Sequence, residues 1–199
     1  MKKTCGVVMV MIMILVIGLG GALAQEKNPI ATQTAFTKID TNSDGVITVV
    51  EHNAFWKERF KDIDTNKDGK LIAAEFEAAN KQAFSNADAN KDNILVAQEF
   101  VAYWCGTEAK APKKAKGKVT RNMDINKDGK ISKDECVVFW MGRYLDMDTN
   151  KDGKVTMDEF LVKMKKRFKE IDKNSDGYIS VQEYDYYWSG KLASAKKAK

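Results

Sequence analysis

Histidine and proline are almost absent from the 199-residue sequence, which contains one and two of them respectively. The single histidine, His52, directly follows a glutamate, and the sequence has neither a nucleophile paired with a base nor a phosphate-binding glycine loop. We therefore expect no enzyme active site. The scarcity of proline, together with glycines that mostly recur at one kind of position, favours helices joined by short, uniform loops. Because no nucleic-acid-reading motif is present, we also expect no nucleic-acid partner.

The N-terminal segment differs from the rest of the chain. Two lysines precede an uncharged run over residues 4–24, which is rich in Val, Met, Ile and Leu and ends in Ala-Leu-Ala. A basic start, an apolar stretch and small residues at its end predict a secretory signal peptide over residues 1–24, cleaved before Gln25. The segment resembles bacterial signal peptides, so we expect a secreted or periplasmic protein. The alternative is an uncleaved membrane anchor, because about 20 apolar residues also span a bilayer.

The motif Asp-x-Asn-x-Asp occurs six times along the chain. Successive copies begin 24 residues apart, except for a gap of 36 residues between the third and the fourth. Periods of this length indicate repeated supersecondary units. The copies begin at Asp40, Asp64, Asp88, Asp124, Asp148 and Asp172.

The six repeats form two similar halves. A shift of 84 residues aligns them, and 13 of 22 positions are identical between residues 55–76 and 139–160. The sequence therefore predicts a duplicated three-loop unit, with a polar connection that is rich in Lys and Ala. The expected segments are 25–105 with loops 1–3, a basic linker at 106–118, 119–190 with loops 4–6, and a basic tail at 191–199.

Each repeat supplies oxygen atoms in an order that suits a calcium ion, which binds six to eight oxygens at about 2.3–2.6 Å. Positions 1, 3 and 5 of a loop offer Asp, Asn and Asp, position 7 offers its carbonyl, and position 12 offers both oxygens of a Glu. Glycine at position 6 permits the left-handed backbone of the bend. This pattern is similar to the loop motif of the EF-hand family. The resemblance implies an all-α fold of helix–loop–helix repeats, with Ca²⁺ as the bound ion.

The resemblance also implies a set of metal ligands in each loop, with only the backbone carbonyl used at position 7. In the first half these are Asp40, Asn42, Asp44, Val46, Thr48 and Glu51, then Asp64, Asn66, Asp68, Lys70 and Glu75, then Asp88, Asn90, Asp92, Ile94 and Glu99. In the second half they are Asp124, Asn126, Asp128, Lys130, Ser132 and Glu135, then Asp148, Asn150, Asp152, Lys154, Thr156 and Glu159, then Asp172, Asn174, Asp176, Tyr178, Ser180 and Glu183.

Some loops depart from the full pattern. Asn93 replaces the glycine of the third loop, and because Asn tolerates left-handed backbone better than most residues, we expect that loop to form at some cost. Ile72 and Val96 occupy position 9 of the second and third loops and cannot bind the ion, which leaves that place to water. Since position 3 is Asn throughout, each loop has three carboxylates, and we expect micromolar or weaker affinities.

The spacing also predicts the helices. About 15 residues separate loops that begin 24 residues apart, enough for one helix of roughly 22 Å that leaves one loop and enters the next. An aromatic residue four positions before most loops should pack the core, and a branched aliphatic residue or Leu at position 8 should pair the loops through short strands. Loops 1 and 3, and loops 4 and 6, are candidates for pairing. The alternative is pairing of loops 3 and 4 across the linker.

Two further features have open interpretations. Cys105 and Cys136 remain after cleavage, and they form either a disulfide, which an oxidising compartment permits, or buried thiols. The four tryptophans recur at matching places in both halves. They either pack the core or line an apolar groove that calcium opens for a protein target.

The basic charge of the chain has two interpretations. Residues 1–24 contain two of the 33 basic residues and none of the 28 acidic ones, so the remaining chain has a net charge of +3, which six calcium ions would raise to about +15. Lysines in the linker and tail are either solvated or attracted to an anionic envelope surface.

From the six loops and the N-terminal segment together, we predict an exported calcium-binding protein that acts as a buffer, a sensor or a calcium-stabilised structural module. The alternative is a calcium-dependent adhesion or assembly module similar to dockerins, although dockerin loops end in Asp and these end in Glu.

Overall fold

The computed structural model describes residues 34–112 and 123–190, and within them the fold is all-α with very short strands, as predicted. The first half contains α1 (Ala35–Ile39), β1 (Ile47–Thr48), α2 (Val49–Ile63), β2 (Lys70–Ile72), α3 (Ala73–Ala87), β3 (Ile94–Val96) and α4 (Ala97–Cys105). The second half contains β4 (Lys130–Ile131), α5 (Lys133–Met147), β5 (Lys154–Thr156), α6 (Met157–Ile171), β6 (Tyr178–Ser180), α7 (Val181–Asp185) and a π-helical turn, η2 (Tyr186–Gly190).

The predicted signal peptide, the basic tail and most of the predicted linker lie outside the described residues. Of the helices in residues 34–112 and 123–190, none is long and apolar enough to cross a membrane.

The prediction that one helix serves two successive loops is confirmed by α2, α3, α5 and α6. Each has 15 residues and runs from the end of one loop to the start of the next. Each begins after loop position 9 and ends at the first Asp of the following loop. The backbone N–H of that Asp donates to the carbonyl of the aromatic residue four positions earlier, at 2.9–3.0 Å in these four helices. The aromatic residue therefore packs the core and also accepts the last helical hydrogen bond.

One hydrophobic core contains residues from both halves. On α6, Phe160, Met164, Phe168 and Ile171 form one buried apolar stripe. The branched aliphatic or Leu residues at loop position 8 are among the most deeply buried, because each lies in a short strand that faces a second loop. These residues are Ile47, Leu71, Leu95, Ile131, Val155 and Ile179, and each is at most 1% exposed.

The loops pair in a way that neither sequence alternative anticipated. Strand β1 pairs with β4, β2 with β6, and β3 with β5, all antiparallel, so loops 1 and 4, 2 and 6, and 3 and 5 are partners. The expectations of pairs 1–3 and 4–6, or of a 3–4 pair, are wrong. A half with three loops cannot pair all of them internally, whereas pairing across the halves buries all six position-8 side chains.

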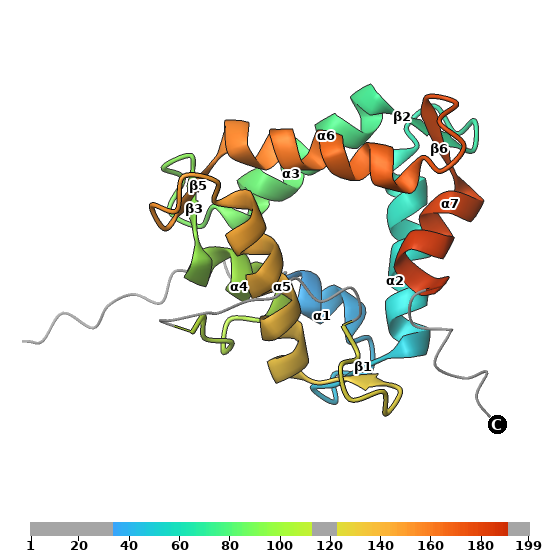
Figure 1. Ribbon diagram of the computed structural model, residues 1–199. Helices are drawn as coiled ribbons and strands as arrows, with labels where there is room; N and C mark the ends of the chain where they lie inside the picture. The colour runs from blue at the N-terminus through green and yellow to red at the C-terminus, as the bar shows by residue number, and fades with distance from the viewer. Residues whose placement is uncertain (1–33, 113–122, 191–199) are drawn as a thin grey trace, which may run out of the picture.

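The two halves are arranged symmetrically around the shared core. A shift of 84 residues converts the 2–6 pair into the 5–3 pair and leaves the 1–4 pair unchanged. The helices follow the same rule, since α3 packs on α6, α4 on α5, and α2 on α7 and η2. Figure 1 shows the resulting ring of helices, with the strand pairs at its corners. Each half therefore contributes one member to every strand pair.

Aromatic side chains pack the core of the ring, and a disulfide links two of the helices around it. Trp56 stacks on Trp188, with ring centroids 3.7 Å apart, and Trp104 stacks on Trp140 at 3.9 Å. The two stacks adjoin, because the Trp56 and Trp104 centroids lie 6.2 Å apart. The tryptophans therefore pack the core. Cys105 at the end of α4 forms a disulfide with Cys136 in α5. Of the two interpretations of these cysteines, a disulfide or buried thiols, the structure therefore shows the disulfide.

Candidate metal centres

The aspartate at position 1 anchors each loop from its buried end. All six position-1 carboxylates are buried, at 3–8% exposed. In every loop one carboxylate oxygen accepts the backbone N–H of position 5, at 3.1–3.2 Å. The other accepts the N–H of position 6, at 2.8–3.1 Å. These bonds bend the backbone around the carboxylate, and position 6 consequently has a positive φ in all six loops.

The side chains at positions 3 and 5 are held by local turns. The Asn Oδ1 at position 3 accepts the N–H of position 5 at 2.9–3.1 Å. One Asp oxygen at position 5 accepts the N–H of position 7 at 2.8–3.2 Å. Asn and Asp commonly form such side-chain-to-backbone turns. The three predicted side-chain ligands at positions 1, 3 and 5 are therefore brought together in each loop, as expected.

The glutamate at position 12 closes each loop. In loops 1, 2, 4 and 6 one of its oxygens accepts the backbone N–H groups of positions 2 and 3, whereas in loop 3 it accepts only that of position 3 and in loop 5 only that of position 2. The other oxygen accepts the N–H of position 9 in all six loops, at 2.9–3.2 Å. In loops 1, 4, 5 and 6 the position-9 hydroxyl also accepts the N–H of the Glu, which makes a reciprocal capping box at the start of the helix. In loops 2 and 3, Ile72 and Val96 have no hydroxyl, and only the glutamate bond to their N–H remains.

Hydrogen bonds lower the pKa of the position-12 glutamates in loops 1 and 5. The backbone N–H of Thr48, followed by smaller contributions from hydroxyl groups, lowers the pKa of Glu51 to about 2. The backbone N–H of Thr156 and the hydroxyl of Thr149 lower the pKa of Glu159 to about 2. Each carboxylate is therefore negative at neutral pH and available to a cation.

The third loop forms despite its departure from the pattern. Asn93 adopts a left-handed backbone with φ of 63°, and its N–H donates to Asp88 at 2.8 Å, as the glycine N–H does elsewhere. The prediction that this loop still forms is confirmed. Left-handed backbone is less favourable for Asn than for Gly, so the third loop has an energetic cost that the other five avoid.

The available donors suit calcium. All the predicted ligand atoms are oxygens, which hard cations prefer. An ionised carboxylate can accept about four hydrogen bonds, and Asp40 accepts only two, so its oxygens keep lone pairs for a cation. Glu51 already accepts five, so an ion bound there displaces some of these donors. In residues 34–112 and 123–190 no group of three or more Asp, Glu, His or Cys side chains is arranged to hold a metal ion. The sequence pattern predicts that a cation in these loops also takes the Asn amide oxygen and the position-7 carbonyl.

Tyr144 connects two loops and was not identified from the sequence. Its hydroxyl lies between the carbonyl oxygens of Leu95 in loop 3 and Gly153 in loop 5, at 3.0 Å and 2.7 Å. Burial, and then the carboxylates of both loops, raise the pKa of this hydroxyl, so it remains a donor. The only signal in the sequence is that Tyr replaces the Phe found before four other loops.

Comparison with known proteins agrees with this geometry. The family model described as EF hand matches residues 32–51, 57–78, 121–135, 146–162 and 164–185. These segments include the first, second, fourth, fifth and sixth loops; the third, with Asn93, lies outside them. No curated protein matches the chain. With five matched segments, and six loops that share one hydrogen-bonding scheme, the chain belongs to the EF-hand family of calcium-binding proteins.

Proposed function

We propose that this calcium-binding protein acts as a calcium-stabilised structural module and buffer, in which the bound ions hold the two halves of the chain together. The observation that carries the proposal is the loop pairing: every strand pair joins one loop from each half. An ion that binds only the native state stabilises that state by mass action. Ions at these three junctions therefore stabilise the association of the halves as well as the individual loops.

The aromatic core supports a structural role over a sensor that opens a groove. The stacked pairs Trp56–Trp188 and Trp104–Trp140 each join a first-half residue to a second-half residue. Stacked aromatic pairs contribute about 0.5–1.5 kcal/mol beyond the burial of their area. Opening the ring would separate both pairs and expose buried tryptophan. The disulfide between Cys105 and Cys136 opposes the same movement, because it links α4 of one half to α5 of the other.

We propose no catalytic role for the only histidine. His52 is 3% exposed, and its Nε2 accepts a hydrogen bond from Trp56 Nε1 at 2.9 Å. Burial lowers the pKa of His52 to about 4, so the ring is neutral at physiological pH. The neutral His52 ring therefore satisfies the indole N–H of Trp56 within the core.

We also propose that the mature protein is exported. The N-terminal pattern of residues 1–24 and the disulfide between two well-buried cysteines support this, because disulfides persist mainly in oxidising compartments. Mass spectrometry of the protein from its native host tests both points. The expected mass corresponds to a chain that begins at Gln25 and lacks two hydrogens, and an uncleaved chain would contradict the proposal.

Calcium-dependent exposure of apolar surface tests the structural role against the sensor role. We expect an apolar dye to fluoresce strongly with the chelated protein and weakly after calcium is added, while far-ultraviolet circular dichroism gains helical signal. The Glu159→Gln variant weakens one loop and should require more calcium for the same transition. A sensor would show the opposite, with dye fluorescence that rises on calcium addition and a helical signal that is already complete without it.

A further inference from the structure

Three arginines surround the aromatic core without carboxylate partners. Arg59 lies on α2, Arg143 on α5 and Arg167 on α6. Among the residues that the structure describes, all four ion pairs with N–O distances up to 4.0 Å involve lysine. The three guanidinium groups therefore retain positive charge near the core that no nearby carboxylate neutralises directly.

Arg143 has the least satisfied of these guanidinium groups. The residue is 8% exposed, and its buried Nε has no hydrogen-bond partner among the described residues. Its guanidinium lies over aromatic rings, 4.3 Å from the Phe139 centroid and 5.6 Å from the Trp188 centroid. Aromatic faces attract a cation, but they do not satisfy an in-plane N–H donor in the way that an oxygen or an anion does.

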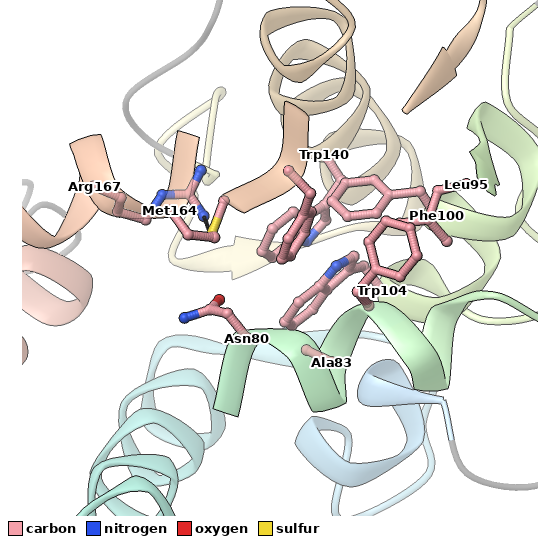
Figure 2. A pocket seen from close by; sticks show the side chains of 10 residues that line it. Asn80, Ala83, Leu95, Phe100, Trp104, Trp140, Met164 and Arg167 are labelled. Carbon is pink, nitrogen blue, oxygen red and sulfur yellow. Dashed lines mark hydrogen bonds between the residues drawn. The ribbon is translucent and has the colours of Figure 1, made fainter. Parts of the chain in front are cut away.

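Arg167 points into a cavity beside the tryptophans. Figure 2 shows its guanidinium next to Met164, with Asn80 below and with Trp104 and Trp140 across the space. The only hydrogen bond that Arg167 makes to a described residue is a weak one from Nη1 to the Met164 sulfur at 3.7 Å. The first half has Ala83 at the equivalent position, so the positive charge of Arg167 occurs in the second half and has no counterpart in the first.

An adjoining cavity of about 40 Å³ brings the donors together. Arg59, Arg167 and Trp188 all line it, together with Tyr184 and the Asn80 side chain. The buried indole Nε1 of Trp188 makes no well-aligned hydrogen bond in the described part of the chain, but it lies near enough to the Tyr184 hydroxyl to lower the pKa of that group against the effect of burial. The Arg59 guanidinium makes only a long hydrogen bond to the Ala79 carbonyl, at 3.5 Å. Buried donors without partners are rare in native proteins, and they indicate an ordered water or a bound ion.

Like charges make an anion a better occupant than water. Burial, and then the neighbouring charge of Arg143, lower the pKa of Arg167 to about 10, so the Arg167 guanidinium stays protonated at neutral pH. Asp146 and Glu170 favour the charged form of Arg167 from a distance, but Asp146 already pairs with Lys163 at 3.1 Å. Arg143 is buried and Arg167 is partly buried, so a negative charge near both groups offsets their mutual repulsion and the desolvation of Arg143.

We propose that the aromatic core holds one small monovalent anion, a halide ion or the carboxylate of a one- or two-carbon acid. The anion accepts bonds from Arg59, Arg167 and the Trp188 indole N–H, and it lies in the field of Arg143. The cavity limits the size of the ligand. A single water needs about 10–15 Å³ by this kind of measure, so 40 Å³ accommodates a small ion and excludes a larger organic acid. This site is separate from the calcium loops and does not depend on the structural role proposed for them.

The test compares anions that fit the cavity with one that does not. Calcium-saturated protein is melted in sodium bromide, sodium formate or the bulky sodium benzenesulfonate, at equal ionic strength and over a range of concentrations. We expect bromide and formate to raise the melting temperature by several degrees along a saturating curve, and benzenesulfonate to have no saturable effect. A larger response to bromide identifies a halide site, and a larger response to formate identifies a carboxylate site.

Matched variants separate the site from general salt effects. Arg167→Met keeps an unbranched apolar stem but removes the guanidinium, and it should raise the half-saturating bromide concentration at least about tenfold, whereas Lys166→Met removes an exposed neighbouring charge and should not change it. Arg59→Met tests the opposite wall of the cavity if Arg167→Met does not fold. Crystals grown in bromide should show an anomalous peak beside Arg167. Equal responses of parent and Arg167→Met, or a cavity that contains only water in bromide crystals, would overturn the proposal.

Discussion

Replacing Tyr144 with phenylalanine should weaken the junction between the two halves without disturbing the packing around it. Tyr144 is 1% exposed, and its hydroxyl contacts the carbonyl oxygens of Leu95 and Gly153, which belong to opposite halves. Phe fits at this place, because Phe60 occupies the equivalent position in the first half. The variant therefore removes a buried hydrogen bond and leaves two carbonyl groups without it. Such a loss costs about 1–3 kcal/mol of unfolding free energy.

Urea unfolding in saturating calcium measures this loss. With a slope of about 2 kcal/mol per molar urea, the midpoint should fall by about 0.5–1.5 M while the slope stays constant. The control is Tyr186→Phe, which removes an exposed phenol and should shift the midpoint very little. Calcium affinity of loops 3 and 5 should fall together, because the hydroxyl contacts both. If the Tyr144→Phe midpoint matches that of the control, the bridge between the loops contributes nothing and the reasoning is refuted.

Three other predictions concern single features. Calorimetry should count five or six bound calcium ions with loop 3 the weakest, and Asn93→Gly should tighten that loop by up to about 1 kcal/mol because it relieves a left-handed Asn; three or fewer ions would contradict the ligand sets. Reducing the Cys105–Cys136 disulfide, which spans 31 residues, should lower the unfolding free energy by about 3–4 kcal/mol, and an unchanged urea midpoint after reduction would argue against it. Replacing the lysines of residues 106–118 and 191–199 with glutamine should reduce calcium-dependent sedimentation with anionic vesicles, more so at low salt; equal sedimentation would show that these lysines are only solvated.

The helices and loops could be predicted because their causes are local. The loop hydrogen bonds join residues at most ten positions apart, such as Thr41 and Glu51, so the twelve-residue motif already contains them. The 24-residue spacing then leaves room for one helix, and the position-8 residues and preceding aromatics are buried as expected. Even the irregular third loop followed from the ability of Asn93 to adopt positive φ.

The partners of the loops could not be predicted, because their determinants are not local. All six position-8 residues are aliphatic and nearly equivalent, so the sequence gives no preference for one pairing. The disulfide depends on that pairing, since it requires α4 and α5 from different halves to adjoin. The same holds for Arg143, a charged residue that lies between mainly apolar neighbours in the sequence and is buried because α5 packs against α4 of the other half. Tyr144 became a bridge for the same reason.

Coupling between calcium sites tests the central claim that loops pair across the halves. Substituting Gln for the position-12 glutamate weakens one loop, and double-mutant cycles measure how strongly two loops interact. The account predicts a coupling free energy above about 0.5 kcal/mol for Glu99→Gln with Glu159→Gln, and likewise for Glu75→Gln with Glu183→Gln. It predicts near-additive effects for Glu99→Gln with Glu135→Gln, whose loops follow one another in sequence but do not pair. Strong coupling of that last pair, with additive effects for the first two, would contradict the account.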